Sequence, residues 1–332
     1  MIIGVDIGGT KISVSLGRED KDSIEIVKKI CEKTPPDLPE ALDMITRNTA
    51  ELIRLAEEKK EPAAAIGISC GGPLDSKKGT INSPPNLPGW DNVPIVRFMT
   101  KHFDLPCALQ NDANACALAE HAWGAGKGTD NMIFLTFGTG LGAGLILNGD
   151  LYTGTNEMAG EVGHIRLEPA GPVGFRKAGS FEGFCSGGGI AQLGQKILSE
   201  YQEQGKASLL IADDASLRDI TAKTIGEAAE QGDPAALKIW ATTGEKLGQG
   251  LAILIDLLNP ECIVIGSIFM RQEKYIRPAM EKALREEALE TSLAVCRVAP
   301  AALGENLGDY AALSIASDLL MHSSRKSMRK NG

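Results

Sequence analysis

The stretch that decides the fold lies at the start of the chain, where residues 2–16 read IIGVDIGGTKISVSL. The β-rich run breaks at Gly8-Gly9, and an alternating pattern resumes at Lys11, which predicts two strands joined by a tight glycine turn. Residues 132–149 repeat the pattern as MIFLTFGTGLGAGLILNG. Each copy is a strand, a glycine turn containing a threonine, and a second strand. This weak internal repeat predicts two α/β lobes that face each other across a cleft.

The composition restricts the classes of protein that fit the chain. Its 332 residues exceed what one hydrophobic core usually organises, so two domains are expected. A formal net charge of −9 lacks the cationic field that binds a phosphate backbone, and we expect no nucleic-acid partner. Seven scattered cysteines, no secretory leader and no apolar run long enough for a bilayer predict a cytoplasmic protein without a membrane anchor.

The first glycine turn has the parts of a phosphate-binding loop. Gly8 and Gly9 allow backbone N–H groups to approach a phosphate closely, and Thr10 adds a hydroxyl donor. The carboxylate of Asp6 could meet a phosphate-bound Mg²⁺ through water. A hairpin turn that needs glycine only for positive φ explains a single turn equally well. Two such turns, one in each lobe, favour nucleotide phosphates.

The second turn partly fits a dinucleotide-binding fingerprint, but its context does not. That fingerprint requires a helix N-terminus after the glycines, whereas residues 144–149 read GLILNG, which is typical of a strand that ends in a turn. Neither turn contains the Gly-Lys-Ser/Thr of a Walker phosphate loop. A nucleotide-linked oxidoreductase therefore fits this segment less well than phosphate binding.

Asn111 and Asp112 follow an apolar strand, at a position where side chains project into a cleft. An aspartate there can take the proton from an attacking hydroxyl, as the general base of phosphoryl transfer does. Helix N-capping suits both residue types as well, and the residues alone favour capping over catalysis. Both interpretations stay open at this point.

Other polar residues suit a sugar. Glu161 and His164 place a carboxylate and an imidazole three residues apart, outside the His-Glu-x-x-His zinc pattern. Glu182 follows in a glycine-rich stretch and, taken alone, is typical of a solvated surface acid. Asn86 and Trp90 lie in a proline-rich loop, where they could contact a sugar or simply pin the loop.

In this order, the motifs resemble the ROK family of sugar kinases (repressors, open reading frames and kinases), in particular its glucokinase-like members. The resemblance spans nearly the whole chain. Residues 6–11 match the family's first phosphate motif and residues 138–144 its second. The loop at 71–90 resembles the family's sugar-side loop, and residues 260–266 resemble its adenosine-side strand and turn.

The resemblance implies a two-lobed actin-like ATPase fold of the ribonuclease H-like α/β class, with a central cleft. We expect an N-terminal lobe over residues 1–122 and a C-terminal lobe over residues 123–309, with a helix at about 310–325 that packs back on the first lobe. The resemblance also implies ATP and Mg²⁺ as cofactors, a free hexose as substrate, and a homodimer or homotetramer.

The resemblance further assigns the site residues. Asp112 would be the general base that deprotonates a sugar hydroxyl, most often the one on C6, while Mg²⁺ and the glycine turns neutralise phosphate charge. The sugar would be bound by Gly72, Asn86, Asn111, Asp112, Glu161, His164 and Glu182. ATP would be bound by Asp6, Gly8, Gly9, Thr10, Lys11, Thr139, Gly140, Gly142 and Gly266, with Asp6 also meeting Mg²⁺ through water.

One segment departs from the family pattern. The family usually carries three cysteines after the histidine, which bind a structural zinc ion together with it. Here residues 171–180 read GPVGFRKAGS, and Cys185 is the only thiol nearby. A tetrahedral structural zinc site needs four ligands. We therefore expect no zinc site, a loop held by packing or hydrogen bonds, and a His164 that binds no metal.

Several alternatives stay open. Glucose is the first-choice substrate, but N-acetylmannosamine, N-acetylglucosamine, mannose, fructose and allose differ from it only in the pocket shape they need. Repressors of the family carry a helix-turn-helix domain ahead of the first motif. Only five residues precede Asp6, so we expect no such domain, and the rival from another class is a sugar sensor that does not bind DNA. A non-catalytic actin-like assembly protein would leave Glu161, His164 and Glu182 without a purpose.

Overall fold

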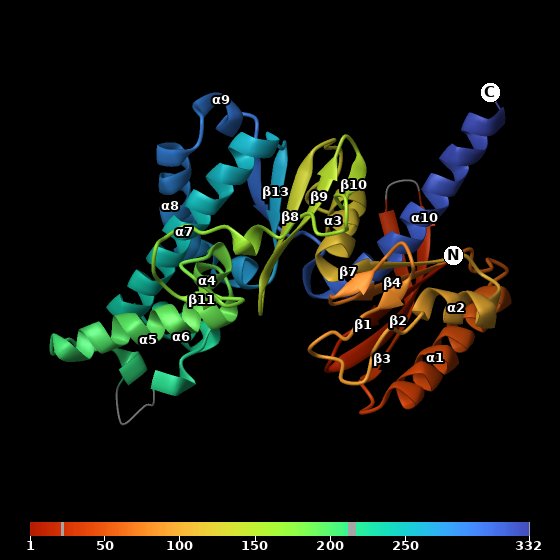
Figure 1. Ribbon diagram of the computed structural model, residues 1–332, viewed down its shortest axis with the longest axis horizontal. Helices are drawn as coiled ribbons and strands as arrows, with labels where there is room; N and C mark the ends of the chain where they lie inside the picture. The colour runs from red at the N-terminus through yellow and green to blue at the C-terminus, as the bar shows by residue number, and fades with distance from the viewer. Residues whose placement is uncertain (21–22, 212–216, 332) are drawn as a thin grey trace. The chain divides into compact units, whose positions relative to one another are not determined.

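The computed structural model describes residues 1–20, 23–211 and 217–331, with side chains up to residue 323. The chain forms two compact units (Figure 1). Unit 1 consists of Met1–Gly128, Asp150–Glu157 and Ala302–Gly332, and unit 2 of Thr129–Gly149 and Met158–Ala301. The expected division at residues 122/123 and 309/310 differs from this one, because unit 1 also includes residues 123–128, 150–157 and 302–309.

Unit 1 is built on a five-stranded sheet of order β3-β2-β1-β4-β7. The first three strands pair antiparallel, while β1, β4 and β7 are parallel. Their bounds are β1 Ile2–Ile7, β2 Lys11–Asp20, β3 Ser23–Lys33, β4 Ile66–Cys70 and β7 Cys107–Asn111. In the register of the parallel strands, Asp6 lies beside Ser69, and Cys70 beside Asn111. The carboxyl ends of three strands therefore meet at one edge of the sheet.

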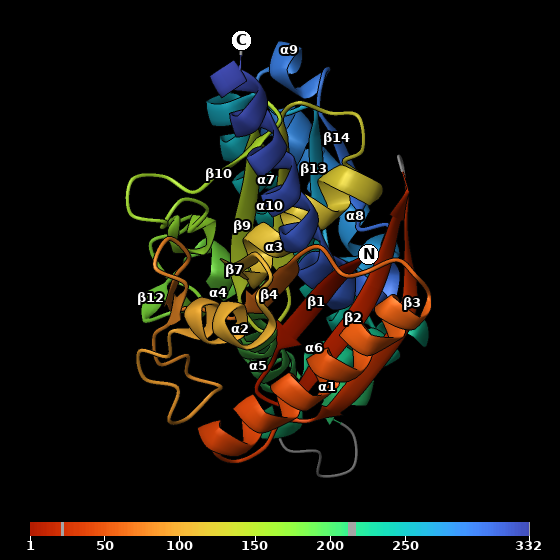
Figure 2. The same cartoon turned by 90° about the vertical axis from the view of Figure 1, so that its right-hand side faces the viewer.

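Different helices pack on the two faces of this sheet, and the two faces differ in the size of their side chains. One face carries branched apolar residues such as Val5 and Val14, which share a core with Met44 and Leu52 of α1 (Leu38–Glu58; Figure 2). The opposite face carries small residues, and a Cβ atom on Gly67 would lie 2.2 Å from a backbone oxygen of α10 (Leu307–Asn331). The C-terminal helix of the chain thus packs directly on the first sheet.

The remaining elements of unit 1 border the edge where the strands end. They are α2 Ile95–Phe103, α3 Asp112–Trp123, the short strands β5 Leu74–Asp75 and β6 Thr80–Ile81, and the 3₁₀ turn η4 Gly304–Asn306. The helix α3 follows β7 without an intervening loop, so the end of a strand leads directly into a helix N-terminus.

Unit 2 repeats the strand plan of unit 1. Its strands have the order β9-β8-β13-β14, in which β8 and β9 are antiparallel and β8, β13 and β14 are parallel. The bounds are β8 Met132–Phe137, β9 Leu141–Leu147, β13 Cys262–Ile265 and β14 Arg297–Pro300, while β10 Asp150–Tyr152 lies in the segment Asp150–Glu157 of unit 1. The internal repeat in the sequence therefore corresponds to two strand–turn–strand units, each at the head of its own sheet.

Helices and a small hairpin complete unit 2. The long helices α7 (Pro234–Leu258) and α8 (Ile268–Glu287) pack closely, because Gly244 and Gly248 of α7 lie against backbone oxygens of α8. The helices are α4 Phe181–Phe184, α5 Gly187–Glu203, α6 Ala222–Glu230, α7 Pro234–Leu258, α8 Ile268–Glu287 and α9 Glu290–Leu293. The shorter elements are η1 Val162–His164, η2 Leu209–Ile211, η3 Leu217–Asp219, and the hairpin strands β11 Val173–Gly174 and β12 Lys177–Ala178. Within the described residues, no helix is both long and apolar enough to cross a membrane.

Candidate functional site

In unit 1, Asn111 and Asp112 stand at the junction of β7 and α3. The Asn111 side-chain oxygen accepts the N–H of Asn114 at 2.8 Å, so Asn111 is the N-cap of α3. Asp112 is the first helical residue, and its carboxylate accepts the N–H of Ala113 at 2.8 Å. Capping is thus what Asn111 does, and it leaves the Asp112 carboxylate exposed at a helix N-terminus, where an anion is stabilised.

Burial and charge perturb the acids of this edge. Although Asp112 is accessible to solvent, the surrounding protein displaces enough water to raise the pKa of its carboxyl, against the lowering effect of two backbone N–H groups. Asp6 is more enclosed, and burial, followed by the nearby charges of Asp309 and Asp112, raises its pKa to about 6. Lys11 and Lys29 lower it in part.

The carboxylate of Asp309, whose charge acts on Asp6, has bonding partners of its own. Asp309 is buried in the first turn of α10, where it accepts hydrogen bonds from the hydroxyls of Ser13 at 2.7 Å and Ser15 at 3.0 Å. It also pairs with the ammonium of Lys29. The charge of this carboxylate contributes to the raised pKa of Asp6.

The first glycine turn connects β1 to β2 beside these acids. Gly8 donates to the backbone oxygen of Lys11 at 3.1 Å, and the Thr34 hydroxyl donates to the oxygen of Gly8 at 2.6 Å. Positive φ is not the reason for glycine here, since neither Gly8 nor Gly9 has one. The reason at Gly9 is a close approach, because a Cβ atom there would lie 2.3 Å from the backbone oxygen of Asn86.

The same contact brings the 71–90 loop to the turn. Trp90 is 2% exposed and pins this loop into the core, while Asn86 is exposed beside Gly9. A Cβ atom on Gly72 would meet no atom within 4 Å, so this glycine borders open space. Of the two roles considered for the loop's aromatic residue, Trp90 holds the loop and leaves the amide of Asn86 available.

In unit 2, the second glycine turn has a different set of supports. Gly138 donates to the oxygen of Gly140 at 3.1 Å, and Gly142 donates to the hydroxyl of Thr136 at 3.0 Å. Thr139, at the tip, is exposed. The carboxylate of Glu182 accepts the N–H of Leu141 at 3.1 Å, so Glu182 is not a free surface acid. None of the glycines of this turn has positive φ.

Glu161 and His164 lie against this second turn through the 3₁₀ element η1. A Cβ atom on Gly163 would lie 2.4 Å from the backbone oxygen of Leu141 and 3.1 Å from the Cβ of Glu182. The packing therefore places the segment from Glu161 to His164, the acid Glu182 and the glycine turn side by side. His164 is exposed and presents its ring to the surface of unit 2.

Gly266 completes the expected set in unit 2 and draws attention to residues that the sequence analysis missed. It follows β13 and donates to the backbone oxygen of Leu135 at 3.0 Å, beside the end of β8. Ser267 follows with a positive φ of 54° and faces Gly138. The N–H of Gly187, at the start of α5, donates to the oxygen of Gly138 at 2.8 Å. The run Ser-Gly-Gly-Gly at 186–189 was the sequence signal for this second approach to the turn.

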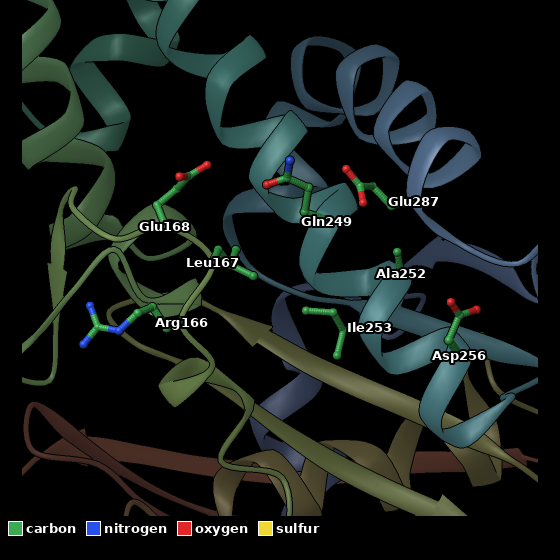
Figure 3. A pocket seen from close by; sticks show the side chains of 8 residues that line it. All are labelled: Arg166, Leu167, Glu168, Gln249, Ala252, Ile253, Asp256 and Glu287. Carbon is green, nitrogen blue, oxygen red and sulfur yellow. The ribbon is translucent and has the colours of Figure 1, made fainter.

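A cavity of unit 2 lies apart from the expected residues. It is lined by Arg166, Glu168, Gln249, Asp256 and Glu287 together with three apolar side chains (Figure 3). Its polar groups have structural partners, since Asp256 accepts the N–H of Leu289 at 3.0 Å and Glu168 pairs with Lys246 at 2.5 Å. None of the residues expected to bind a ligand lines this cavity, and we assign it no ligand.

The donor set does not suit a structural zinc ion. The segment at 171–180 supplies no thiolate, and Cys185 is buried, with its thiol directed to the backbone oxygen of Thr243 at 3.8 Å. Across the part of the chain that the structure describes, no three His, Cys, Asp or Glu side chains come together as metal ligands. Four convergent ligands are required, so these residues do not fit zinc.

Known proteins resemble this chain over most of its length. A glucokinase from Thermotoga maritima is 32% identical over 320 residues, which cover 96% of this chain and 97% of the relative. A ROK family glucokinase from Streptomyces griseus, solved in complex with glucose and AMPPNP, is 32% identical to this chain. The match covers 95% of this chain and 99% of the glucokinase chain, with a TM-score of 0.73. The DNA-binding regulator NagC from Escherichia coli is 31% identical over 296 residues, 86% of this chain and 71% of the relative. Residues 2–318 match the ROK family, and the chain, with its two-lobed actin-like α/β fold, belongs to that family.

Proposed function

We propose that the protein is an ATP-dependent hexose kinase that transfers the γ-phosphoryl group to the C6 hydroxyl of a free sugar, with glucose as the first-choice substrate. The observation that carries the proposal is the Asp112 carboxylate. It is accessible, has a raised pKa and lies on the same sheet edge as Asp6 and the first glycine turn. A repressor that only senses a sugar has no need for such a base.

Asp112 acts as the general base. A raised pKa makes its carboxylate a stronger proton acceptor than an ordinary aspartate, while the N-terminus of α3 holds the group in place. Asn111 uses its carbonyl oxygen to cap the helix, so its amide nitrogen is the group that donates to a sugar hydroxyl. Adjacent residues thus divide positioning and proton transfer between them.

Each unit carries hydrogen-bonding groups of the kind that bind a sugar. In unit 1 these are Asn86 from the pinned loop and the open backbone at Gly72. In unit 2 they are Glu161, His164 and Glu182, which pack around η1 and the second turn. Carboxylates and an imidazole can accept and donate several bonds to vicinal hydroxyls, as recognition of a hexose requires.

The glycine turns bind the phosphates of ATP. Each turn presents backbone N–H groups and an exposed threonine hydroxyl, from Thr10 in unit 1 and Thr139 in unit 2. Gly266, which follows β13, is assigned to the adenosine side. When bound, Mg²⁺ neutralises phosphate charge, and Asp6, whose own charge is opposed by two neighbouring carboxylates, is the residue that would meet it through water.

Glucose is the first choice because a relative that covers 96% of this chain is named as a glucokinase, and another glucokinase was solved with glucose and AMPPNP. The other hexoses and N-acetylhexosamines considered above remain alternatives for the same site. We also propose that the protein is cytoplasmic and forms a homo-oligomer. Light scattering on a size-exclusion column would measure its oligomeric state.

The test is release of ADP from Mg-ATP across a panel of free hexoses and N-acetylhexosamines. We expect turnover with one sugar, and a loss of about 10³-fold in kcat for Asp112→Asn. Asp104→Asn is the matched control, because Asp104 is an exposed residue at the end of α2, where asparagine is equally suited to its positive φ of 52°. If a sugar binds but no member of the panel is turned over, the result would instead favour a sugar sensor.

A further inference from the structure

The segment that departs from the family pattern folds into a compact hairpin. Its two strands, β11 and β12, are joined by a turn at Phe175 and Arg176. The hairpin follows η1 in the chain and returns to it, because Phe181 donates to the backbone oxygen of Ile165 at 2.8 Å. It therefore stands beside His164.

Two hairpin residues hold His164 from different sides. The ring of Phe175 meets the imidazole edge to face, with centroids 5.2 Å apart. The ammonium of Lys177 donates to the backbone oxygen of His164 at 2.5 Å. One contact orients the ring and the other fixes the backbone that carries it.

The turn adopts a conformation that costs energy. Phe175 and Arg176 have φ values of 38° and 67°, in the left-handed region that bulky residues rarely occupy. Phe175 is also 73% exposed, so burial of its ring does not offset this cost. Strain of this kind persists where the surrounding structure holds it, and it is frequent at functional sites.

The base of the hairpin supplies that hold. The guanidinium of Arg166 donates to the oxygen of Ala178 at 2.6 Å, and two N–H groups, of Leu167 and Glu168, donate to the oxygen of Gly179 at 2.9 and 3.0 Å. The Gln192 amide accepts from the N–H of Val173 and donates to its oxygen, at 2.9 and 3.0 Å. Figure 3 shows the side chains of Arg166 and Glu168.

The same hairpin reaches Glu182. A Cβ atom on Gly174 would lie 2.7 Å from the Cβ of Glu182, and Ser180, at the end of the hairpin, caps the helix that carries this acid. The hairpin thus contacts two of the three unit 2 residues that the proposed function assigns to the sugar.

We propose that this hairpin takes the place of a metal ion, with Phe175 and Lys177 as the residues that position His164 for the sugar. The residues present do not fit zinc, whereas the hydrogen bonds and the ring contact fix the same loop without one. The proposal rests on the proposed function only for the step in which His164 contacts the sugar.

The experiment combines kinetics, metal analysis and NMR on the full chain. We expect Phe175→Ala and Lys177→Met to raise the KM for the sugar roughly tenfold and leave the KM for ATP unchanged. Lys177→Arg, which keeps a donor, should restore most of the affinity, and Arg176→Gln, at the same turn, should behave as wild type. Purified protein should contain no stoichiometric zinc and should keep its activity in a chelator.

A readout that does not depend on activity separates this proposal from the proposed function. The chain has only four histidines, so the imidazole resonances can be assigned. Removing the ring in Phe175→Ala should shift the His164 resonances and leave the other three in place. Unmoved His164 resonances, one zinc per chain, or a sugar KM raised no more than in Arg176→Gln would overturn the proposal. If no sugar is turned over, the NMR and metal results still decide whether the hairpin holds His164 without a metal.

Discussion

The two units share one strand plan but support their glycine turns in different ways. Each turn joins two antiparallel strands at the head of a sheet that continues with two parallel strands. The turn of unit 1 lies beside acids whose charges repel one another, since Asp309 and Asp112 both raise the pKa of Asp6. The turn of unit 2 is held by backbone N–H groups that donate to the hydroxyl of Thr136 and to the carboxylate of Glu182.

This difference indicates how a repeated fold divides the work of a site. The topology places a glycine turn and the carboxyl ends of parallel strands at one edge in both units. The side chains that follow the strands then decide whether the edge holds charge, for proton transfer and a cation, or hydrogen-bonding groups, for orientation. The comparison can be tested by substitutions in the two units.

The largest effect is expected from a matched pair of glutamates. Glu120 is fully buried and accepts the N–H groups of Ala125, Ala302 and Leu303 at 2.7, 3.2 and 3.0 Å. Glu261 accepts those of Asp130 and Asn131 at 2.8 and 3.0 Å, but it is exposed. Glu120→Ala should lower the free energy of unfolding by about 3–5 kcal/mol, and Glu261→Ala by less than about 1 kcal/mol, because water can replace only the exposed acceptor.

Urea denaturation followed by circular dichroism measures both values. If the Glu120→Ala protein does not fold, Glu120→Gln keeps one acceptor oxygen and should lie between it and the wild type. Equal losses for the two alanine variants would show that burial does not distinguish these acceptors.

The next effect concerns the charge at the edge of unit 1 and depends on pH. Folding raises the pKa of Asp6 from 3.8 to about 6, so the stability that its proton contributes is complete below pH 3.8 and is lost as the pH rises through about 6. At 1.36 kcal/mol for each pKa unit, Asp6→Asn should stabilise the protein by at most about 3 kcal/mol at pH 8 and by nothing near pH 4.

Chemical denaturation of wild type and variant at several pH values checks this sign. Asp309→Asn is the contrasting variant, since it removes the partner of Lys29 and should destabilise the protein at neutral pH. If Asp6→Asn stabilised the protein equally at every pH, the cost of ionising the Asp6 carboxylate in the folded state would not be the cause.

The smallest effect separates the two turns themselves. A Cβ atom at Gly9 would meet backbone at 2.3 Å, whereas one at Gly140 would meet the end of the Glu182 side chain at 3.1 Å. Gly9→Ala should therefore cost about 1–3 kcal/mol, and Gly140→Ala less than about 1 kcal/mol, because a side chain can move and the backbone cannot do so cheaply. Thermal unfolding of both variants would show it, and an equal shift in Tm would argue that the turns tolerate a side chain alike.

Local patterns predicted much of this molecule. The two strand–turn–strand motifs and the strand that leads into Asn111 follow from periodicity and glycine placement within short stretches. The strand β3 and the helix α2 were not anticipated. Charged residues interrupt the apolar pattern of β3, and α2 is short and follows a proline-rich loop.

Contacts between distant residues could not be predicted in the same way. Glu182 looks like a surface acid until the N–H of Leu141, far away in the sequence, is found beside it. The need for glycine at position 9 comes from Asn86, and the place of Phe175 against His164 comes from a hairpin turn at positive φ. Such constraints depend on the assembled fold and leave little trace in residue spacing.

The most direct test of the account compares binding with chemistry in Asp112→Asn. Titration calorimetry gives the Kd for the sugar, and ADP release gives kcat for the same preparation. The account predicts a loss of kcat of about 10³-fold with a Kd within about tenfold of wild type, because Asp112 acts mainly on the proton in the transition state. Turnover that survives the substitution, or a Kd that weakens as much as kcat falls, would contradict the role of Asp112 as the general base.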